Sequence, residues 1–186
     1  MNREASVKRT TIGIVAAVLA MSATAALAQS KPPLKLGGIL DMSSLYADIT
    51  GPGSEAAAKM AAEDFGGEEL GRKIENFAAD HQNKADLSAN IARDMLDNQG
   101  VEMLFDVAAS ATALAAGEIA KARNKLIMFN GPATIALTNE ACGPYTVHYV
   151  FDTFGQANVT GLAAEILRRH LRRILAADPG DVGIKP

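Results

Sequence analysis

The chain is 186 residues long and 48% hydrophobic, enough for one domain with a proper core and short for two. Its formal net charge is −3, and residues 29–186 carry 15 basic and 20 acidic residues, whereas a nucleic-acid partner normally requires a basic surface. The single cysteine, Cys142, excludes an intramolecular disulfide, so the fold must depend on core packing. No sequence feature places a base beside Cys142, which favours a small buried or loop residue over a nucleophile.

Residues 1–28 have the three parts of a secretory signal. Basic residues come first, the apolar run Ile12–Ala20 follows, and Ala26-Leu27-Ala28 forms an A-x-A cleavage site. The apolar run is too short to span a bilayer as a stable helix. We therefore expect cleavage after Ala28, export of the mature chain, and a short tether at residues 29–33.

Strands and helices are expected to alternate after the tether. The predicted strands are Leu34–Asp41, Arg72–Asp80, Val101–Val107, Lys125–Phe129 and Tyr145–Phe151. The predicted helices are Ala56–Phe65 with Ser54 as N-cap, Lys84–Asn98, Ala111–Ala122, and Phe154–Leu167 with Ala157, Gly161 and Ala164 as small contact residues. This order predicts an α/β fold: an open, mostly parallel sheet with right-handed crossovers and helices on both faces.

The last stretch of the chain is basic. Its arginines, Arg168, Arg169, Arg172 and Arg173, crowd six positions, and two turns rich in Pro and Gly follow. The pattern favours a solvated basic helix end with a loose terminus over a nucleic-acid or membrane patch.

Polar turns follow two neighbouring strands. Ser110 and Thr112 stand where the third strand gives way to a helix, so their hydroxyls and the first backbone N–H groups suit either an anionic group such as a carboxylate or an ordinary N-cap. The loop after the fourth strand contains Asn130, Ala133 and Thr134, and adjacent parallel strands bring their carboxyl ends side by side. This chemistry suits holding a molecule rather than changing it, so we expect no catalytic residue, cofactor or metal.

Two further turns lie at the same predicted edge. The first loop supplies Ser44 and Tyr46, which suit a small amphipathic ligand, although Tyr46 suits covering the sheet edge equally well. Asp80 and His81 end the second strand; an acid/base pair or a metal site is possible there, and a hydrogen-bonded turn is favoured because no third spaced ligand exists. His148, inside a predicted strand, is expected to be a core or edge histidine.

An alternative interpretation is a Rossmann-like nucleotide-binding enzyme domain. Gly51, Gly53 and Ala56 satisfy G-x-G-x-x-A, and Asp80 ends the second strand where a ribose-binding acid would stand. Some ten residues separate Asp41 from Gly51, however, and a proline interrupts the glycine turn. Both features count against this alternative.

Several motifs in register resemble one family. They are LKLGGILDMSSLYADITGPGSEAAAKMAAEDF, ADHQNKAD, the Ser110 turn, FNGPATIALT and YTVHYVFDTFGQA. Over about Leu34–Leu167 the chain resembles the periplasmic solute-binding proteins of ABC transporters for branched-chain amino acids and amides, which are leucine-binding-protein-like and have the type I periplasmic binding fold.

The resemblance implies a non-enzymatic, two-lobed monomer that closes on an amino acid or small amide and delivers it to an ABC permease in the membrane. By position, the grip on the ligand's carboxylate and ammonium groups falls on Ser110, Ala133 and Thr134. Thr112 belongs to the same turn as Ser110, and Tyr46 and Ser44 would line the cleft.

The resemblance fades after Leu167. Family members continue through a second lobe, whereas residues 168–186 look unrelated to the next family segment. The expected organisation is a first lobe at 34–167 and a divergent tail, with the second lobe missing. Because a half cleft cannot enclose its ligand, weak or absent binding is expected.

Overall fold

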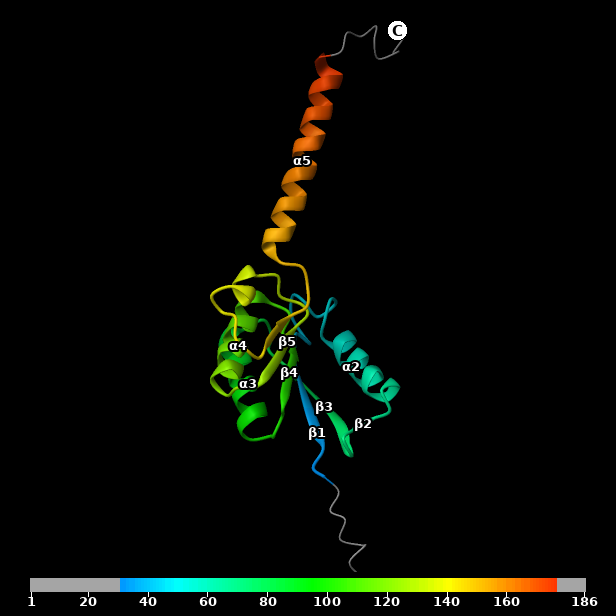
Figure 1. The fold of residues 1–186 in the computed structure, drawn as a ribbon, viewed down its shortest axis with the longest axis vertical. Coiled ribbons are helices and arrows are strands. Elements are labelled where there is room, and N and C mark those ends of the chain that lie inside the picture. The colour runs from blue at the N-terminus through cyan, green and yellow to red at the C-terminus, as the bar shows by residue number, and fades with distance from the viewer. Residues whose placement is uncertain (1–30, 177–186) are drawn as a thin grey trace, which may run out of the picture.

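The computed structural model describes residues 31–176 (Figure 1). The predicted signal segment and the end of the predicted tail, residues 177–186, lie outside the described residues. Within the described part, no helix has both the length and the apolar character needed to cross a membrane.

One sheet of six strands organises the fold, in the order β2-β3-β1-β4-β5-β6 (Figure 1). The strands are β1 (Leu34–Leu40), β2 (Glu68–Glu69), β3 (Arg72–Asp80), β4 (Met103–Asp106), β5 (Leu126–Phe129) and β6 (Thr146–His148). All neighbours pair in parallel except β2, which is antiparallel to β3. The predicted α/β class is therefore confirmed, and the two-residue β2 is an addition that the sequence pattern did not predict.

Helices lie on both faces of the sheet, as expected. The helices of the described residues are α2 (Pro52–Asp64), α3 (Ala85–Asp97), α4 (Ser110–Ala122), the 3₁₀ turn η1 (Ile135–Thr138) and α5 (Thr153–Ala176). Figure 1 shows α3 and α4 against one face and α2 against the other. The predicted third and fifth strands are three and four residues too long, because the apolar runs extend past the residues that pair.

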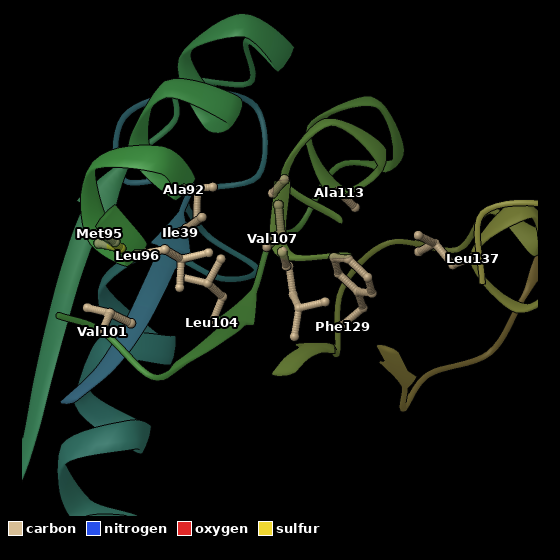
Figure 2. Close-up of a cluster of buried hydrophobic side chains, with 13 residues drawn as sticks. Ile39, Ala92, Met95, Leu96, Val101, Leu104, Val107, Ala113, Phe129 and Leu137 are labelled. Carbon is tan, nitrogen blue, oxygen red and sulfur yellow. The ribbon is translucent and has the colours of Figure 1, made fainter. Parts of the chain in front are cut away.

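The core lies between the sheet and the helix pair α3 and α4 (Figure 2). Ile39, Leu104 and Phe129 are completely buried there, together with alanines of α4 that allow the helix to approach closely. No residue of α2 belongs to this cluster, and α2 has no buried residue at all. The two faces of the sheet are thus covered unequally.

The predicted start of the first helix is wrong by four residues. The helix begins at Pro52, with Gly51 as N-cap at a φ of 58°, and Ser54 lies inside the first turn. A Cβ at Gly51 would come within 2.4 Å of the Asp41 carbonyl oxygen, so only glycine fits there. Proline suits the first helical position because it needs no hydrogen-bond acceptor.

The last helix differs most from its prediction. Instead of ending at Leu167, α5 continues through all four arginines to Ala176, so the predicted boundary between lobe and tail falls inside one helix. The predicted contacts through Ala157, Gly161 and Ala164 are also wrong, because no residue of α5 is buried. The arginines are solvent-exposed, as expected.

Candidate ligand-binding site

The first turn of α4 presents free hydrogen-bond donors at the carboxyl edge of the sheet. Ala109 is the N-cap and has no capping side chain, so the first backbone N–H groups of α4 have no side-chain acceptor. Ser110 is half-exposed, and its hydroxyl makes no hydrogen bond to another residue within 31–176. This turn suits an anionic group, as the sequence predicts.

Thr112 has a different environment from Ser110. Its side chain is buried, and its hydroxyl donates to the Ala109 carbonyl oxygen at 2.8 Å. Its own carbonyl accepts a hydrogen bond from the Ser88 hydroxyl at 3.0 Å. Thr112 therefore joins α4 to α3, and its hydroxyl donates within the protein.

The loop after β5 lies directly against the turn after β4. A Cβ at Gly131 would be 2.8 Å from the Cα of Ala108, so the two backbones touch, and the expectation that these turns are neighbours is confirmed. Thr134 caps η1 by accepting the Ala136 N–H at 3.3 Å. Ala133 accepts the Thr153 N–H at 2.7 Å, which ties the loop to the start of α5.

His148 also holds this loop in place. It is half-buried on the edge strand β6, and its Nε2 donates to the Pro132 carbonyl oxygen at 2.7 Å. It is thus the edge histidine that the sequence favours. The nearby Cys142 is an exposed loop residue.

A buried carboxylate organises the loop after β1. Asp41 accepts hydrogen bonds from the Ser44 N–H at 2.8 Å, the Ser44 hydroxyl at 2.6 Å and the Tyr46 N–H at 3.0 Å. Burial raises the pKa of Asp41, but these hydrogen bonds outweigh burial and lower it overall. The Ser44 hydroxyl is therefore engaged within the protein, while the half-buried Tyr46 remains available to line a cleft.

Asp80 and His81 form a hydrogen-bonded turn, as the sequence predicts. Asp80 accepts from the N–H groups of Met42 and Gln82, at 3.0 and 2.9 Å, and from the Ser43 hydroxyl at 2.5 Å. His81 is fully buried, and burial lowers its pKa. Its Nδ1 accepts the Asn83 N–H at 2.9 Å. Among residues 31–176 no three metal-ligating side chains gather into a metal site.

Sequence reasoning missed Asp41 and Asp106 as residues of this edge. Asp106 ends β4 at a φ of 74°, is buried, and finds no hydrogen-bond partner among residues 31–176 for either carboxylate oxygen. Burial raises its pKa, and the nearby Ser54 hydroxyl and His81 offset this only in part. The available signal was an acidic residue at the carboxyl end of the first and third predicted strands, as at the second.

The glycine pattern considered for a nucleotide does not form a phosphate-binding turn. Gly53 lies within α2, and a Cβ there would meet nothing within 4 Å, whereas Gly51 packs against the end of β1. The described polar loops instead gather at the carboxyl edge of the sheet, where the turn before α4 and the loop after β5 touch.

Comparison with known proteins agrees with this geometry. A model of the periplasmic binding protein family matches residues 33–170, and the chain belongs to that family. A search of curated proteins found no match. Members of the family are solute-binding proteins of ABC transporters, generally without enzymatic activity, and membership implies an extracytoplasmic location.

Solved structures show the same similarity. A periplasmic binding protein from Burkholderia mallei is 49% identical, with a TM-score of 0.64 over 65% of this chain and 32% of that one. A branched chain amino acid ABC transporter periplasmic ligand-binding protein from Burkholderia xenovorans is 36% identical, with a TM-score of 0.62 over 69% and 36%.

A more distant solute-binding protein of an ABC transporter, from Rhodopseudomonas palustris, was solved with 3,4-dihydroxybenzoic acid. It is 24% identical, with a TM-score of 0.58 over 64% of this chain and 32% of that one. This chain thus spans about a third of the length of the structures it matches.

Proposed function

We propose that this chain carries ligand-binding residues of the solute-binding component of an ABC importer for an amino acid or small amide of the branched-chain class. The observation that carries the proposal is the uncapped start of α4, with the free Ser110 hydroxyl, against the loop that holds Thr134. The permease in the membrane is its partner, and residues 1–28 direct export and are removed after Ala28.

The ligand's carboxylate lies at the first turn of α4 in this proposal. The backbone N–H groups there and the Ser110 hydroxyl donate to it, and the partial positive charge of the helix start stabilises it. The Thr134 hydroxyl has its hydrogen free to donate while its oxygen caps η1. Ala133 contacts the ligand through its backbone, and Tyr46 covers the apolar side chain.

The ligands associated with two relatives support this assignment. The Burkholderia xenovorans protein belongs to a branched chain amino acid transporter, and the Rhodopseudomonas palustris protein was solved with a benzoic acid. Amino acids and benzoic acids share the carboxylate group. The carboxylate is thus the group that the free backbone N–H donors at the start of α4 would bind.

A heteronuclear NMR titration with leucine, isoleucine and valine tests the proposal. This edge contacts a ligand from one side, so we expect binding at millimolar concentration, with shifts at the amides of Ser110, Ala111 and Thr134. Isoamylamine, which keeps the amine and the branched apolar chain of leucine but has neither carboxylate nor amide, is the matched control and should leave the α4 amides unchanged. If none of these compounds moves them at 20-fold excess, the assignment is wrong.

A further inference from the structure

A buried carboxyl group lies beneath the contact between the two halves of the proposed ligand grip. The Oδ1 atom of Asp106 is 3.3 Å from the position that a Cβ at Gly131 would occupy, and the Cα of Ala108 is 2.8 Å from the same position. Asp106 is only 1% exposed. It therefore lies directly behind the seam between Ala108 and Gly131, where the turn before α4 meets the loop after β5.

The described part of the chain does not satisfy this carboxyl group. Both oxygens of Asp106 are buried, and neither has a hydrogen-bond partner among residues 31–176. Because these atoms expose almost no surface, no group from outside the described residues contacts them while the seam is closed. An unpaired ionised carboxylate is strongly unfavourable in such a place. The folded chain thus favours the neutral acid, and burial raises the pKa of Asp106 accordingly.

The described elements around Asp106 bring no compensating positive charge. His81, after β3, is fully buried, and burial lowers its pKa and so favours the neutral ring. Asp41, at the end of β1, is a second carboxylate and is occupied by its own loop. The Ser54 hydroxyl of α2 lies nearby without a hydrogen bond to Asp106. The loop after β5 contributes the uncharged Gly131, and the first turn of α4 has no charged residue.

The backbone that holds Asp106 in place is strained. Asp106 and Val107 have φ values of 74° and 59°, in the left-handed region that a β-branched residue such as valine rarely adopts. Val107 is fully buried in the core (Figure 2), and its N–H donates to the Ile39 carbonyl oxygen at 3.1 Å. Such strain persists only where the surroundings enforce it, and it is often found at functional sites. The fold therefore holds this carboxyl group beneath the seam although the local backbone disfavours it.

We propose that Asp106 positions the two halves of the ligand grip, and that they stay at binding distance only while its carboxyl group is protonated. The inference rests on the proposed function, since the grip consists of the Ser110 turn and the Thr134 loop.

Loss of the proton should open the seam. Water must then reach the Asp106 carboxylate, because a buried charge without a partner is unfavourable. Val107 is fixed in the core, whereas Asn130 is exposed and Gly131 is half-buried, so the loop after β5 is the side that moves. Its movement carries Thr134 away from the turn before α4.

Leucine affinity therefore depends on pH through Asp106. Because the pKa of Asp106 is raised in the folded chain, affinity is full below this folded pKa and falls as pH rises through it. The ligand's carboxylate at the first turn of α4 adds a like charge nearby, which favours the protonated acid further. Binding is thus coupled to proton uptake, and each unit by which leucine raises this pKa corresponds to an about 10-fold weaker affinity at high pH.

An NMR titration with pH tests the positioning without any ligand. In the chain labelled with ¹³C at aspartate, we expect the Asp106 Cγ signal to titrate above the ordinary range, and the amides of Ala108, Ser110 and Gly131 to shift with the same midpoint. Gly131→Ala, which forces the seam open, should lower that midpoint. Asp106→Asn should abolish the shift of the amides. Amides that still shift in Asp106→Asn, or that stay fixed while Asp106 titrates, would overturn the proposal.

Leucine titrations at pH 5 and pH 8, followed on methyl signals, test the coupling to binding. The unmodified chain should bind about 10-fold more weakly at pH 8, a difference equivalent to one pKa unit. Asp106→Asn is uncharged and tolerates a positive φ, so it should bind at both pH values as the unmodified chain does at pH 5. The matched control, Asp48→Asn in the exposed part of the loop after β1, should keep the full pH dependence.

A further variant excludes the other buried titratable group. His81→Asn keeps an acceptor for the Asn83 N–H and should also retain the pH dependence. If His81→Asn loses the dependence and Asp106→Asn retains it, the proposal is overturned in favour of His81.

The two experiments separate this inference from the proposed function. If the amides follow Asp106 but leucine binds at neither pH, the proposed function is wrong and positioning by Asp106 stands. If leucine binds equally at both pH values, the proposed function stands and the role of Asp106 is overturned.

Discussion

Gly131 packs against Ala108 so closely that a Cβ at residue 131 would lie 2.8 Å from the Ala108 Cα. This contact joins the loop after β5 to the turn before α4, and it therefore sets the distance between the two halves of the proposed ligand grip. Any side chain at Gly131 must push the loops apart.

Gly131→Ala is therefore expected to destabilise the protein by about 1–3 kcal/mol, because overpacking forces the backbone to move. It should also weaken leucine binding. Urea unfolding measures the first effect and the NMR titration the second. The control is Gly53→Ala, which adds the same methyl group in open space on α2 and should stabilise by about 0.5–1 kcal/mol. Equal effects at the two glycines would contradict this account.

Ser110 and Thr112 should respond in opposite ways to loss of their hydroxyls. Ser110→Ala removes a free donor, so it should weaken leucine binding by about 5- to 10-fold, close to one hydrogen bond, and leave stability unchanged. Thr112→Val keeps the shape but removes the buried hydrogen bond to Ala109, and should cost about 1 kcal/mol. If Ser110→Ala lowered stability and Thr112→Val did not, the assignment of Ser110 to ligand binding and Thr112 to the fold would be wrong.

Asp106→Asn should stabilise the protein. Asparagine tolerates the positive φ at this position and carries no charge to bury. Because burial raises the pKa of Asp106, the folded chain holds a proton there above pH 3.8, so its stability falls as pH rises through the folded pKa.

The gain from Asp106→Asn should accordingly be small at pH 4 and about 1–3 kcal/mol at pH 8. Urea titrations at the two pH values measure it. A loss of stability at pH 8 would show that the carboxylate has a stabilising partner there.

Asp41→Asn should have the opposite sign. The hydrogen bonds from Ser44 and Tyr46 lower the pKa of Asp41, so the carboxylate stabilises the fold above pH 3.8, and this contribution disappears as pH falls through the lower folded pKa. At pH 7 the substitution should cost about 1–3 kcal/mol. The control Asp48→Asn, exposed in the same loop, should change stability by less than about 0.5 kcal/mol.

Most of the fold was predictable because the pattern is local. Apolar runs and helical spacing predict the parallel strands and α3 to within a few residues, and right-handed crossovers then arrange the sheet. The neighbouring positions of the Ser110 turn and the Thr134 loop follow from the same rule. The roles within the site were less predictable, because the direction of a hydroxyl such as that of Thr112 depends on packing against Ser88.

The sequence by itself determined the order of elements, the edge where polar turns gather and the family resemblance, because each depends on short-range pattern. The tertiary structure alone decided three other matters. It placed Gly51 against the Asp41 carbonyl and so fixed where α2 begins. It buried Asp106 without a partner. It left α5 without a buried residue among the residues described, since helical periodicity indicates which face of a helix is apolar and not what that face packs against.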